Sequence, residues 1–411
     1  MEYYNDIVQR YSYEENRTVY RPQSYLYSNA SLRLEQNIDF LGGTLFLDSD
    51  LKYYHSYGSY SNSQFTSVPI RLGYSQNLVG YNSFKWTKRI EPLRYTIAEK
   101  TFLYEMEKVA LEVIDRYFQV ALLKEQEQQF CTEMKVCDTL LAKARVRYSL
   151  GKIKETELTK IQLEKGMAQN KYFRVVKELQ EATSRLYLYV GCKKETVENI
   201  SIEFMLPNID IPVNTAICMA KENWVEYLTA QKQILQGQQE LEFAKKQLRF
   251  VSSVNASVGL NQISKDIKEA YRNPFQEKMV NISIQIPIVD NGKLRYKYRQ
   301  TAENLEISMI NQRKKEEDLF VKLTSYIENL SIQQKIVKTM AENYKYSEDV
   351  YDETLELYSL GRNNMEDVSR AAEKRHAVMA EYYDAIKDYW INYYTIRSIT
   401  LYDFVNKKYI V

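Results

Sequence analysis

The tetrapeptide Tyr-Ser-Leu-Gly occurs twice in this chain, as Tyr148–Gly151 and again as Tyr358–Gly361. The second copy starts 210 positions after the first, which is about half of the 411-residue chain. Each copy interrupts a long run in which apolar residues recur with the period of a helix. The same short break at half the chain length indicates a duplicated half, with one long helical hairpin in each copy.

Both helical runs follow a seven-residue apolar repeat, which is typical of helices that pack together as in a coiled coil. Glycine and proline are scarce, at 12 and 7 residues, as long uninterrupted helices require. We therefore predict antiparallel hairpins over residues 89–190 and 291–404. In the first half the repeat contains Met106, Ala110, Val113, Tyr117, Val120, Phe130, Met134, Cys137, Leu141, Ala144 and Tyr148. In the second half the same spacing runs through Leu319, Leu323, Tyr326, Leu330, Gln333, Val337, Met340, Tyr344, Ser347, Tyr351, Thr354 and Tyr358.

Gly151 and Gly361 are expected at the reversals of the two hairpins. Glycine adopts the left-handed conformation that ends a helix without steric cost. Leu150 and Leu360 would then lie exposed at the tips. Two interpretations remain open: the tips are ordinary turns, or they form a docking surface whose partner covers the leucines.

Residues 43–88 and 250–290 follow a two-residue period instead, which predicts a pair of strands in each half. In the second pair, Val280, Ile282 and Ile284 alternate with Asn281 and Ser283, so we expect one apolar face and one polar face. Strands of ~10 residues have the length that crosses an outer-membrane bilayer. A sheet in lipid must close into a barrel, so several copies would share one. A soluble sandwich layer with one buried face is the alternative.

The other segments carry weaker patterns. Residues 1–42 form an N-terminal extension, expected to be truncated, with an extra strand at 31–40. Residues 191–249 form a mixed segment between the halves, and residues 405–411 form a short tail. The chain opens without the basic start and apolar core of a signal peptide.

Composition excludes several classes of function. The 56 basic and 54 acidic residues nearly balance, so no strong field attracts nucleic acid. No window approaches the ~20 apolar residues of a membrane-spanning helix. Tyrosine is abundant, at 36 residues, which suits strands and the wet edges of a membrane.

The residue types needed for catalysis or metal binding are few. His55 and His376 are the only histidines, and no catalytic triad or zinc spacing includes them. We therefore expect no enzyme activity, cofactor or metal. Cys131 and Cys137 are too far round a helix to bridge, whereas Cys192 and Cys218 pair only if the fold brings them together.

The chain resembles the TolC-like outer-membrane efflux proteins over roughly residues 67–404. The resemblance rests on the strand-to-helix passages IRLGYSQNLVGYNSFKWTKRIEPLRY and ISIQIPIVDNGKLRYKYRQTAENLE. It also rests on the two turns, RYSLGKIKETELTKIQLE and LYSLGRNNMEDVSRAAEKR. The two copies 210 residues apart, each preceded by a strand pair and a long helical run, make the resemblance specific.

The resemblance implies a mainly α protein with β structure. Long antiparallel helical hairpins of three copies form an α-barrel in the periplasm, joined to a shared 12-stranded antiparallel β-barrel in the outer membrane of a Gram-negative bacterium. Each protomer of this homotrimer would give four strands. The implied function is the passive exit duct of a tripartite efflux or type I secretion system. The implied partners are a periplasmic adaptor, an inner-membrane transporter and outer-membrane lipid, and no nucleic acid.

The resemblance also assigns roles at the tips. The adaptor would dock on Tyr148, Ser149, Leu150, Gly151, Ser359, Leu360 and Gly361. The periplasmic entrance would be lined by Tyr358, Asn363, Glu366, Asp367 and Arg370. Asp367 matches an inner acidic position of the family, whereas Arg370 and Asn363 depart from its usual pattern. Asp367 either forms a ring of charges in the trimer or is neutralised by Arg370 on the same helix face.

A soluble coiled-coil scaffold with a small β-domain is the rival interpretation of the whole chain. It agrees with the long helices and with the missing leader. It gives no reason for two matching blocks of alternating strands.

Overall fold

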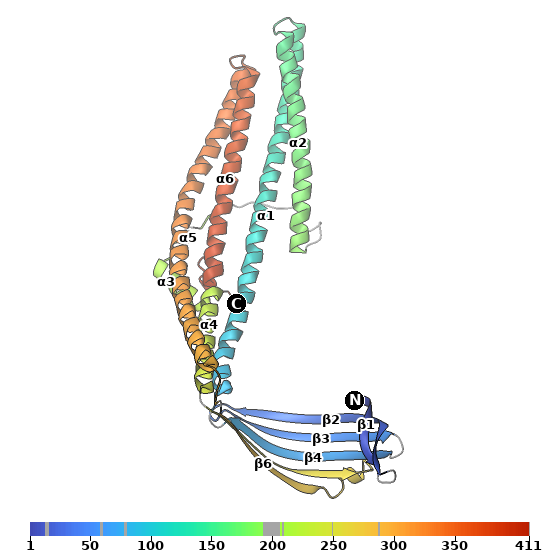
Figure 1. The fold of residues 1–411 in the computed structure, drawn as a ribbon. Coiled ribbons are helices and arrows are strands. Elements are labelled where there is room, and N and C mark those ends of the chain that lie inside the picture. Colours follow the sequence, from blue (N-terminus) through green and yellow to red (C-terminus); the bar gives the residue numbers. More distant parts are fainter. Residues whose placement is uncertain are drawn as a thin grey trace. The chain divides into compact units, whose positions relative to one another are not determined.

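A computed structural model describes residues 1–12, 16–57, 61–77, 80–191, 206–207, 209–248, 250–286 and 288–410. The chain forms two compact units. The first consists of Met1–Tyr95 and Ala230–Gln312, and the second of Thr96–Thr229 and Arg313–Val411. The first unit contains a sheet with helical segments, and the second contains most of the helical structure (Figure 1).

The helices confirm the predicted duplication. Helices α1 (Ser83–Ser149) and α5 (Lys293–Ser359) each have 67 residues. Helices α2 (Glu155–Val190) and α6 (Met365–Thr400) each have 36 residues. Every boundary of the second hairpin lies 210 positions after its counterpart in the first. Two shorter helices, α3 (Val213–Asn223) and α4 (Val225–Gln247), occupy the segment between the halves.

The heptad residues of α5 form the buried stripe that the sequence predicts. Leu319, Leu323 and Leu330 are almost completely buried. They belong to one core cluster with Tyr389 and Tyr393 of α6, and this cluster extends to α3 and α4. Apolar burial of this kind contributes roughly 25 cal/mol per Å² to folding.

The predicted stripe of α1 is wrong at two positions, Met106 and Tyr148, and Tyr148 at the end of the helix is exposed. Met106 is exposed, and the buried residue is its neighbour Glu107. Arg397 of α6 donates to both carboxylate oxygens of Glu107, each at 2.8 Å. Because this ion pair lies on the packed face, α1 is rotated there by about one residue, or 100°, from the apolar repeat.

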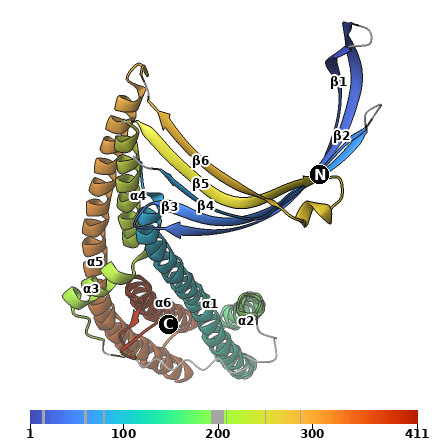
Figure 2. The same cartoon turned by 90° about the horizontal axis from the view of Figure 1, so that it is seen from below.

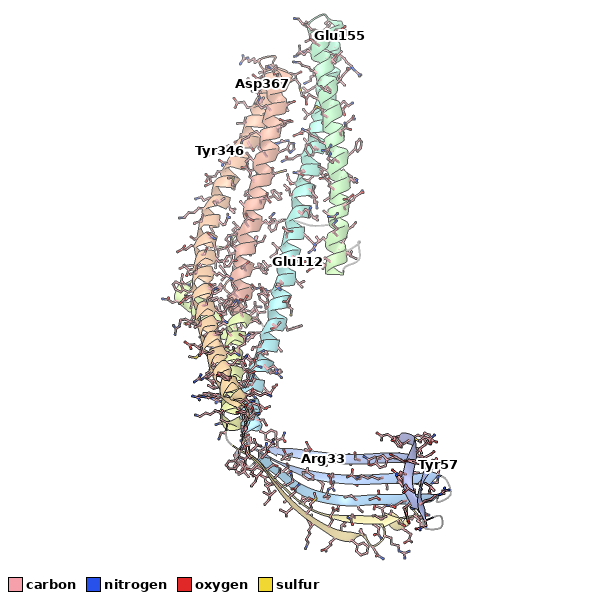
Figure 3. The ribbon with its side chains drawn as sticks, in the orientation of Figure 1. Arg33, Tyr57, Glu112, Glu155, Tyr346 and Asp367 are labelled. Carbon is pink, nitrogen blue, oxygen red and sulfur yellow. The ribbon has the colours of Figure 1, made fainter. Side chains whose placement is uncertain are left out.

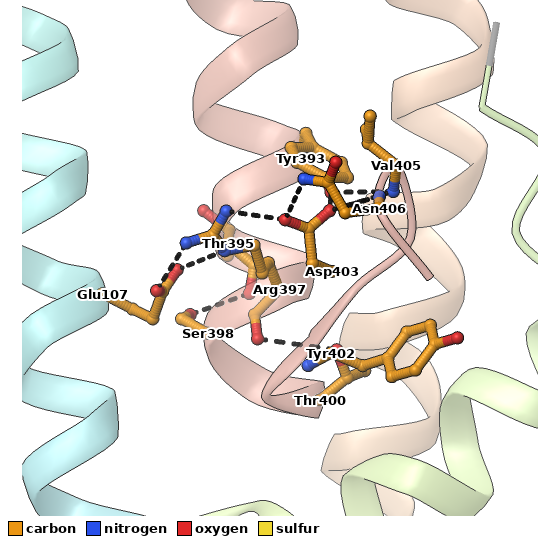
Figure 4. A network of polar contacts seen from close by, with 10 residues as sticks. All are labelled: Glu107, Tyr393, Thr395, Arg397, Ser398, Thr400, Tyr402, Asp403, Val405 and Asn406. Atoms are coloured by element: carbon orange, nitrogen blue, oxygen red, sulfur yellow. Dashed lines mark hydrogen bonds and ion pairs between the residues drawn. The ribbon is translucent and has the colours of Figure 1, made fainter. Parts of the chain in front are cut away.

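The same arginine reaches the C-terminal segment (Figure 4). Asp403 lies in the short strand β7 (Tyr402–Asp403), which pairs with β8 (Lys408–Tyr409). Asp403 accepts hydrogen bonds from Tyr393 Oη at 2.7 Å and Asn406 Nδ2 at 2.8 Å, and its ion pair with Arg397 measures 3.3 Å. Burial acts to raise the pKa of Asp403, but these donors outweigh it and hold the pKa at about 2. Asp403 therefore holds the turn after which residues 405–410 reverse direction.

The sheet of the first unit has six antiparallel strands in chain order. They are β1 (Glu2–Ser12), β2 (Arg17–Ile38), β3 (Gly43–Tyr57), β4 (Asn62–Asn77), β5 (Val251–Ser264) and β6 (Phe275–Gln285). The predicted pairs are β3–β4 and β5–β6. The extra strand expected at 31–40 is the end of the longer β2, and β1 was not predicted because its sequence, EYYNDIVQRYS, lacks sustained alternation.

Two neighbouring rows of residues show the two faces of this sheet. One row contains Leu34, Leu47, Leu72 and Val258, which lie opposite one another from β2 to β5. These four apolar side chains are exposed, and no other described element of the chain covers them. The adjacent row contains Arg33, Asp48, Arg71, Gly259 and Glu277 on the opposite face. The alternation predicted from sequence is therefore confirmed, with Ile284 on the apolar face and Ser283 on the polar face.

Arg71 organises the polar face. Its Nε and Nη2 donate to the two carboxylate oxygens of Asp48, each at 2.9 Å, and Nη2 lies 3.4 Å from Asp50 Oδ2. A Cβ at Gly259 would lie 2.8 Å from the Cβ of Arg71. Position 259 on β5 therefore requires glycine, because a side chain there would collide with Arg71 on the neighbouring strand β4.

Candidate functional site: the two hairpin tips

The two tips have the same backbone structure. Gly151 and Gly361 have φ angles of +67° and +77°. In each tip the glycine N–H donates to the carbonyl of the tyrosine three residues earlier. The N–H of the residue after the glycine donates to the carbonyl that lies five residues before that donor. This is the Schellman arrangement that closes a helix on a left-handed glycine. A Cβ would meet nothing within 4 Å at either position, so the backbone conformation alone accounts for glycine.

Each tip presents a leucine to solvent. Leu150 is 64% exposed and Leu360 is 62% exposed. The preceding serines are also exposed, and each hydroxyl donates to a backbone carbonyl of its own helix: Ser149 Oγ to Val146 and Ser359 Oγ to Glu356. The candidate docking residues thus lie together on both tips, with their local polar groups satisfied and their leucines uncovered.

The two tyrosines of the repeat have different surroundings. Tyr148 is 43% exposed, whereas Tyr358 is 8% exposed. Tyr358 belongs to a core cluster that joins all four long helices, with Leu140 and Ala144 of α1, Ile161 of α2, and Met365 of α6. Burial raises the pKa of Tyr358, and the nearby Glu157 adds to this. Tyr358 therefore holds the second hairpin against the first.

Arg147 makes a second link between the tips, and sequence analysis missed it. Its Nη2 donates to the backbone carbonyl of Ser359 at 3.2 Å. This oxygen lies in the last turn of α5, where helix carbonyls lack a partner within the helix. The only sequence signal for this link is an arginine near the expected end of a helix. Its partner is a backbone carbonyl, which every residue has, so the sequence does not identify it.

Asp367 lies in the first turn of α6, near the second tip (Figure 3), and caps this helix. Asn364 Oδ1 accepts a hydrogen bond from Asp367 N at 3.0 Å, and Asp367 Oδ2 accepts one from Asn364 N at 3.2 Å. This reciprocal capping box fixes the start of α6. The spacing Asn-x-x-Asp in the sequence is its signal.

Arg370 does not neutralise Asp367. Its Nη2 lies 3.4 Å from Glu366 Oε1, one helical turn back, and both side chains are about 70% exposed. An ion pair this exposed contributes little to stability. Of the other entrance candidates, Asn363 is half-buried beside Gly361 and Glu366 is exposed. The five residues lie close in sequence on the second tip, with Tyr358 in the core and the charges at the surface.

Further from the tips, a buried polar cluster connects α1 and α6. Arg375 Nη2 donates to Glu133 Oε1 at 2.5 Å, and His376 Nε2 lies 2.9 Å from the same oxygen. The guanidinium carbon of Arg375 lies 4.0 Å from the ring centroid of Tyr351. No local sequence pattern predicts this cluster, because its members come from three helices, α1, α5 and α6.

The described residues contain no group of three or more side chains suited to hold a metal ion. None of the described helices is long and apolar enough to cross a membrane. Cys131 and Cys137 are free thiols, as expected, and burial raises the pKa of Cys137 to about 11. Cys218 forms no disulfide with the other described cysteines, and the predicted alternative partner, Cys192, lies outside the described residues.

No protein-family model matches the sequence, and neither does any curated protein sequence. Solved structures do match. CusC, whose structures concern folding and transmembrane channel formation, aligns with a TM-score of 0.66 at 13% identity, over 92% of this chain and 83% of that one. The outer membrane channel CmeC of Campylobacter jejuni aligns with a TM-score of 0.65 at 12% identity, over 92% of this chain and 77% of CmeC. The outer membrane protein VceC of Vibrio cholerae aligns at 0.63 and 11% identity, over 92% and 87%. The chain therefore has the fold of the TolC-like outer-membrane channels, as its motifs predicted.

Proposed function

We propose that this protein is the outer-membrane exit duct of a tripartite efflux or type I secretion system. It passes substrates passively from an inner-membrane pump and a periplasmic adaptor to the exterior. The observation that carries this proposal is the sheet, whose exposed apolar face is backed by a polar face with paired charges. The shared fold of the channel proteins supports it independently.

The exposed face of the sheet fits lipid. On β6 the exposed apolar residues recur at every second position, at Val280, Ile282 and Ile284. Exposed Ile286 follows directly after the strand, and at the other end the series stops at Lys278. Apolar side chains on one face of tilted strands form the lipid-facing band of an outer-membrane barrel. A soluble scaffold would leave this face in water, so the rival interpretation is disfavoured.

The polar face fits a water-filled lumen. The bidentate Arg71–Asp48 pair and Glu277 on the same row are suited to water and not to hydrocarbon. Closing the sheet with this face inward requires more than one copy, and the proposed assembly is a homotrimer.

Exposed apolar side chains on the helices support the same assembly. Phe102, Leu163, Phe173, Leu188 and Val321 are each more than 60% exposed. Large exposed apolar surfaces on helices mark protein interfaces. Neighbouring copies would cover them in a helical tunnel that we assign to the periplasm of a Gram-negative cell.

The tips are the proposed docking surface for the adaptor. Leu150 and Leu360 are exposed on turns of the same backbone structure, so a partner with repeated binding elements can engage both in the same way.

The entrance itself is proposed at the second tip, where threefold symmetry would bring three copies of Asp367 toward one axis. Since Arg370 contacts Glu366, the carboxylate of Asp367 remains without a side-chain cation among its described contacts.

Reconstitution tests the function directly. The purified chain, refolded into lipid vesicles and fused with a planar bilayer, should form oligomers that conduct ions. The scaffold interpretation instead predicts a protein that stays monodisperse in buffer without detergent and gives no conductance.

A further inference from the structure

The strands β3, β4, β5 and β6 share one end, at which the chain passes between the sheet and the helices. Gly43 lies opposite Gln76 at this end, and Val251 lies opposite Gln285. Helix α1 begins shortly after β4 ends, α5 begins shortly after β6 ends, and α4 ends shortly before β5 begins. Figure 2 shows α4 and α5 meeting β5 and β6 in this way. We call this the helix end of the sheet.

The three helices pack together beside the helix end. Trp86 of α1 is buried, and its Nε1 donates to Glu242 Oε2 of α4 at 2.7 Å. A Cβ at Gly237 of α4 would lie 3.1 Å from Leu305 Cδ1 of α5, so these two helices are in close contact. The starts of α1 and α5 are therefore held beside α4, and the side chains that they expose belong to one region of the surface.

Six exposed basic side chains gather in this region, and we call them the basic collar. They are Lys85 and Arg89 of α1, and Lys293, Arg295, Lys297 and Arg299 of α5. None of the six forms an ion pair with another described residue. The acidic residues that lie closest to them in sequence have other partners. Glu91 pairs with Arg94, and Asp290 accepts hydrogen bonds from the N–H groups of Gly292 and Leu294, each at 2.9 Å. The collar is therefore a positive surface without a side-chain counter-ion among the described residues.

The cations of α5 point to both sides of the helix. Successive residues of a helix are about 100° apart, so Lys293 and Lys297 share one side. Arg295 and Arg299 share another side, about 160° away. In a ring of copies the collars would lie at one level, and contact between two collars would set cation against cation. A second copy of the chain is therefore an unsuitable occupant of this surface.

The collar follows directly on the apolar face of the sheet. Ile284 of β6 is exposed, and Ile286 and Val289, which come after the strand, are exposed as well. The basic run then begins at Lys293, four positions after Val289. From Lys293 to Arg299 the helix rises about 9 Å. This is close to the depth of the headgroup layer, about 5–8 Å on each side of the hydrocarbon core.

Exposed tyrosines accompany the cations. Tyr95 of α1 and Tyr296 of α5 are both largely exposed. Tyrosine is enriched where a membrane meets water, because its ring is apolar and its hydroxyl is polar. The helix end thus combines an apolar face, aromatic side chains and unneutralised cations in the order in which a bilayer presents hydrocarbon, interface and headgroups.

We propose that the basic collar binds the headgroups of anionic phospholipids in the outer-membrane leaflet that faces the periplasm. Lysine and arginine near an anionic bilayer surface are attracted to it, and this attraction falls off within a Debye length. A zwitterionic lipid carries no net charge and gives the collar no such advantage. The inference rests on the proposed function, because only a sheet inserted in the membrane brings the collar to a bilayer surface.

Folding titrations in two kinds of vesicle test the collar. One kind is phosphatidylcholine alone, and the other is phosphatidylcholine mixed with phosphatidylglycerol. Lys293→Gln/Lys297→Gln and Arg295→Gln/Arg299→Gln remove the cations from the two sides of α5, and glutamine keeps a good helix former at each position. The matched control is Lys335→Gln/Lys338→Gln, which removes two exposed, unpaired cations far beyond the collar on the same helix.

We expect phosphatidylglycerol to favour folding of the unaltered chain, and high salt to remove this gain. One cation near the surface corresponds to a factor of about 5, so the double variant on the bilayer side should lose about 25-fold of the gain. Folding in phosphatidylcholine alone should stay unchanged, and the control should keep the whole gain.

Three results would overturn the collar: no gain from phosphatidylglycerol in the unaltered chain, a full gain in both collar variants, or an equal loss in the control. The last result would mean that the charge of the whole chain attracts the vesicles. Failure of the unaltered chain to insert into either kind of vesicle would instead count against the proposed function, and the collar inference would fall with it.

Discussion

Arg375 of α6 and Glu133 of α1 form a buried ion pair, with Nη2 and Oε1 2.5 Å apart and both side chains about nine-tenths buried. It links the first hairpin to the second. Each charge is taken out of water, so the pair is costly to separate. His376 and Tyr351 enclose the same carboxylate and guanidinium, which makes this cluster a fixed point for the relative position of α1 and α6.

Removing one partner of this pair should destabilise the helical unit strongly. Arg375→Met leaves Glu133 buried without its cation, and the expected loss is about 3–5 kcal/mol. The double variant Arg375→Met/Glu133→Leu should recover most of it, because no buried charge remains. Thermal unfolding of the four members of this double-mutant cycle gives the coupling. Additive losses in the double variant would show that the two residues act separately.

Lysine substitutions on β6 should distinguish a lipid face from a soluble sandwich. Ile284 lies in the middle of the apolar series on β6, and Ser283 lies next to it on the polar face. Ile284→Lys should cost about 2–4 kcal/mol near the bilayer midplane. Ser283→Lys should have a small effect, because its side chain lies on the polar face, which we propose to line the water-filled lumen. Folding titrations in vesicles measure both, and equal losses would argue against a lipid-facing sheet.

How much of this molecule can be predicted from sequence depends on whether a pattern is local. The heptads of α5 and the alternation of β6 are periodic, so they located the hairpins and both faces of the sheet. The burial of Glu107 could not be predicted, because its partner Arg397 lies 290 positions away. The same limit applies to Tyr148 and Tyr358. They stand in identical tetrapeptides, and only the packing of four helices around the second one separates their environments.

The tips should be required for export and dispensable for assembly. Leu150→Glu/Leu360→Glu places charges on two exposed side chains that contact little within the chain, so the oligomer and its conductance should remain. Drug tolerance or secretion in cells should fall to the level of a deletion strain, because a docking partner can no longer cover the tips. The matched control is Val350→Glu, which is also exposed but lies on α5 away from the turn and outside the proposed contacts between copies. Normal export by the tip variant at normal membrane levels would exclude docking there.

Acid should weaken the anchor of the C-terminal segment. The folded-state pKa of Asp403, about 2, lies below the ordinary value of about 3.9 expected when the chain unfolds. A lowered carboxylate pKa stabilises the fold above the unfolded value, and this contribution disappears as the pH falls through about 4 toward 2. Asp403→Asn should lower the melting temperature at neutral pH and show a shallower loss in acid. Parallel acid profiles for the two proteins would mean that Asp403 is not a linked site.

Asp367 caps α6 and has a proposed second role at the entrance, and substitutions can separate the two. Its carboxylate caps α6 through the backbone of Asn364, and three copies near one axis would add their fields at the entrance. Asp367→Asn keeps an oxygen that can accept the capping hydrogen bond but removes the charge. Asp367→Ala removes both, and loss of a cap costs about 0.5–2 kcal/mol. Glu366→Gln is the control, since its carboxylate is already paired with Arg370.

In planar-bilayer recordings, Asp367→Asn should reduce cation preference and block by multivalent cations with little change in stability, whereas Glu366→Gln should change neither. If Asp367→Asn keeps full cation preference while Asp367→Ala lowers only the melting temperature, Asp367 is a helix cap and does not line the entrance.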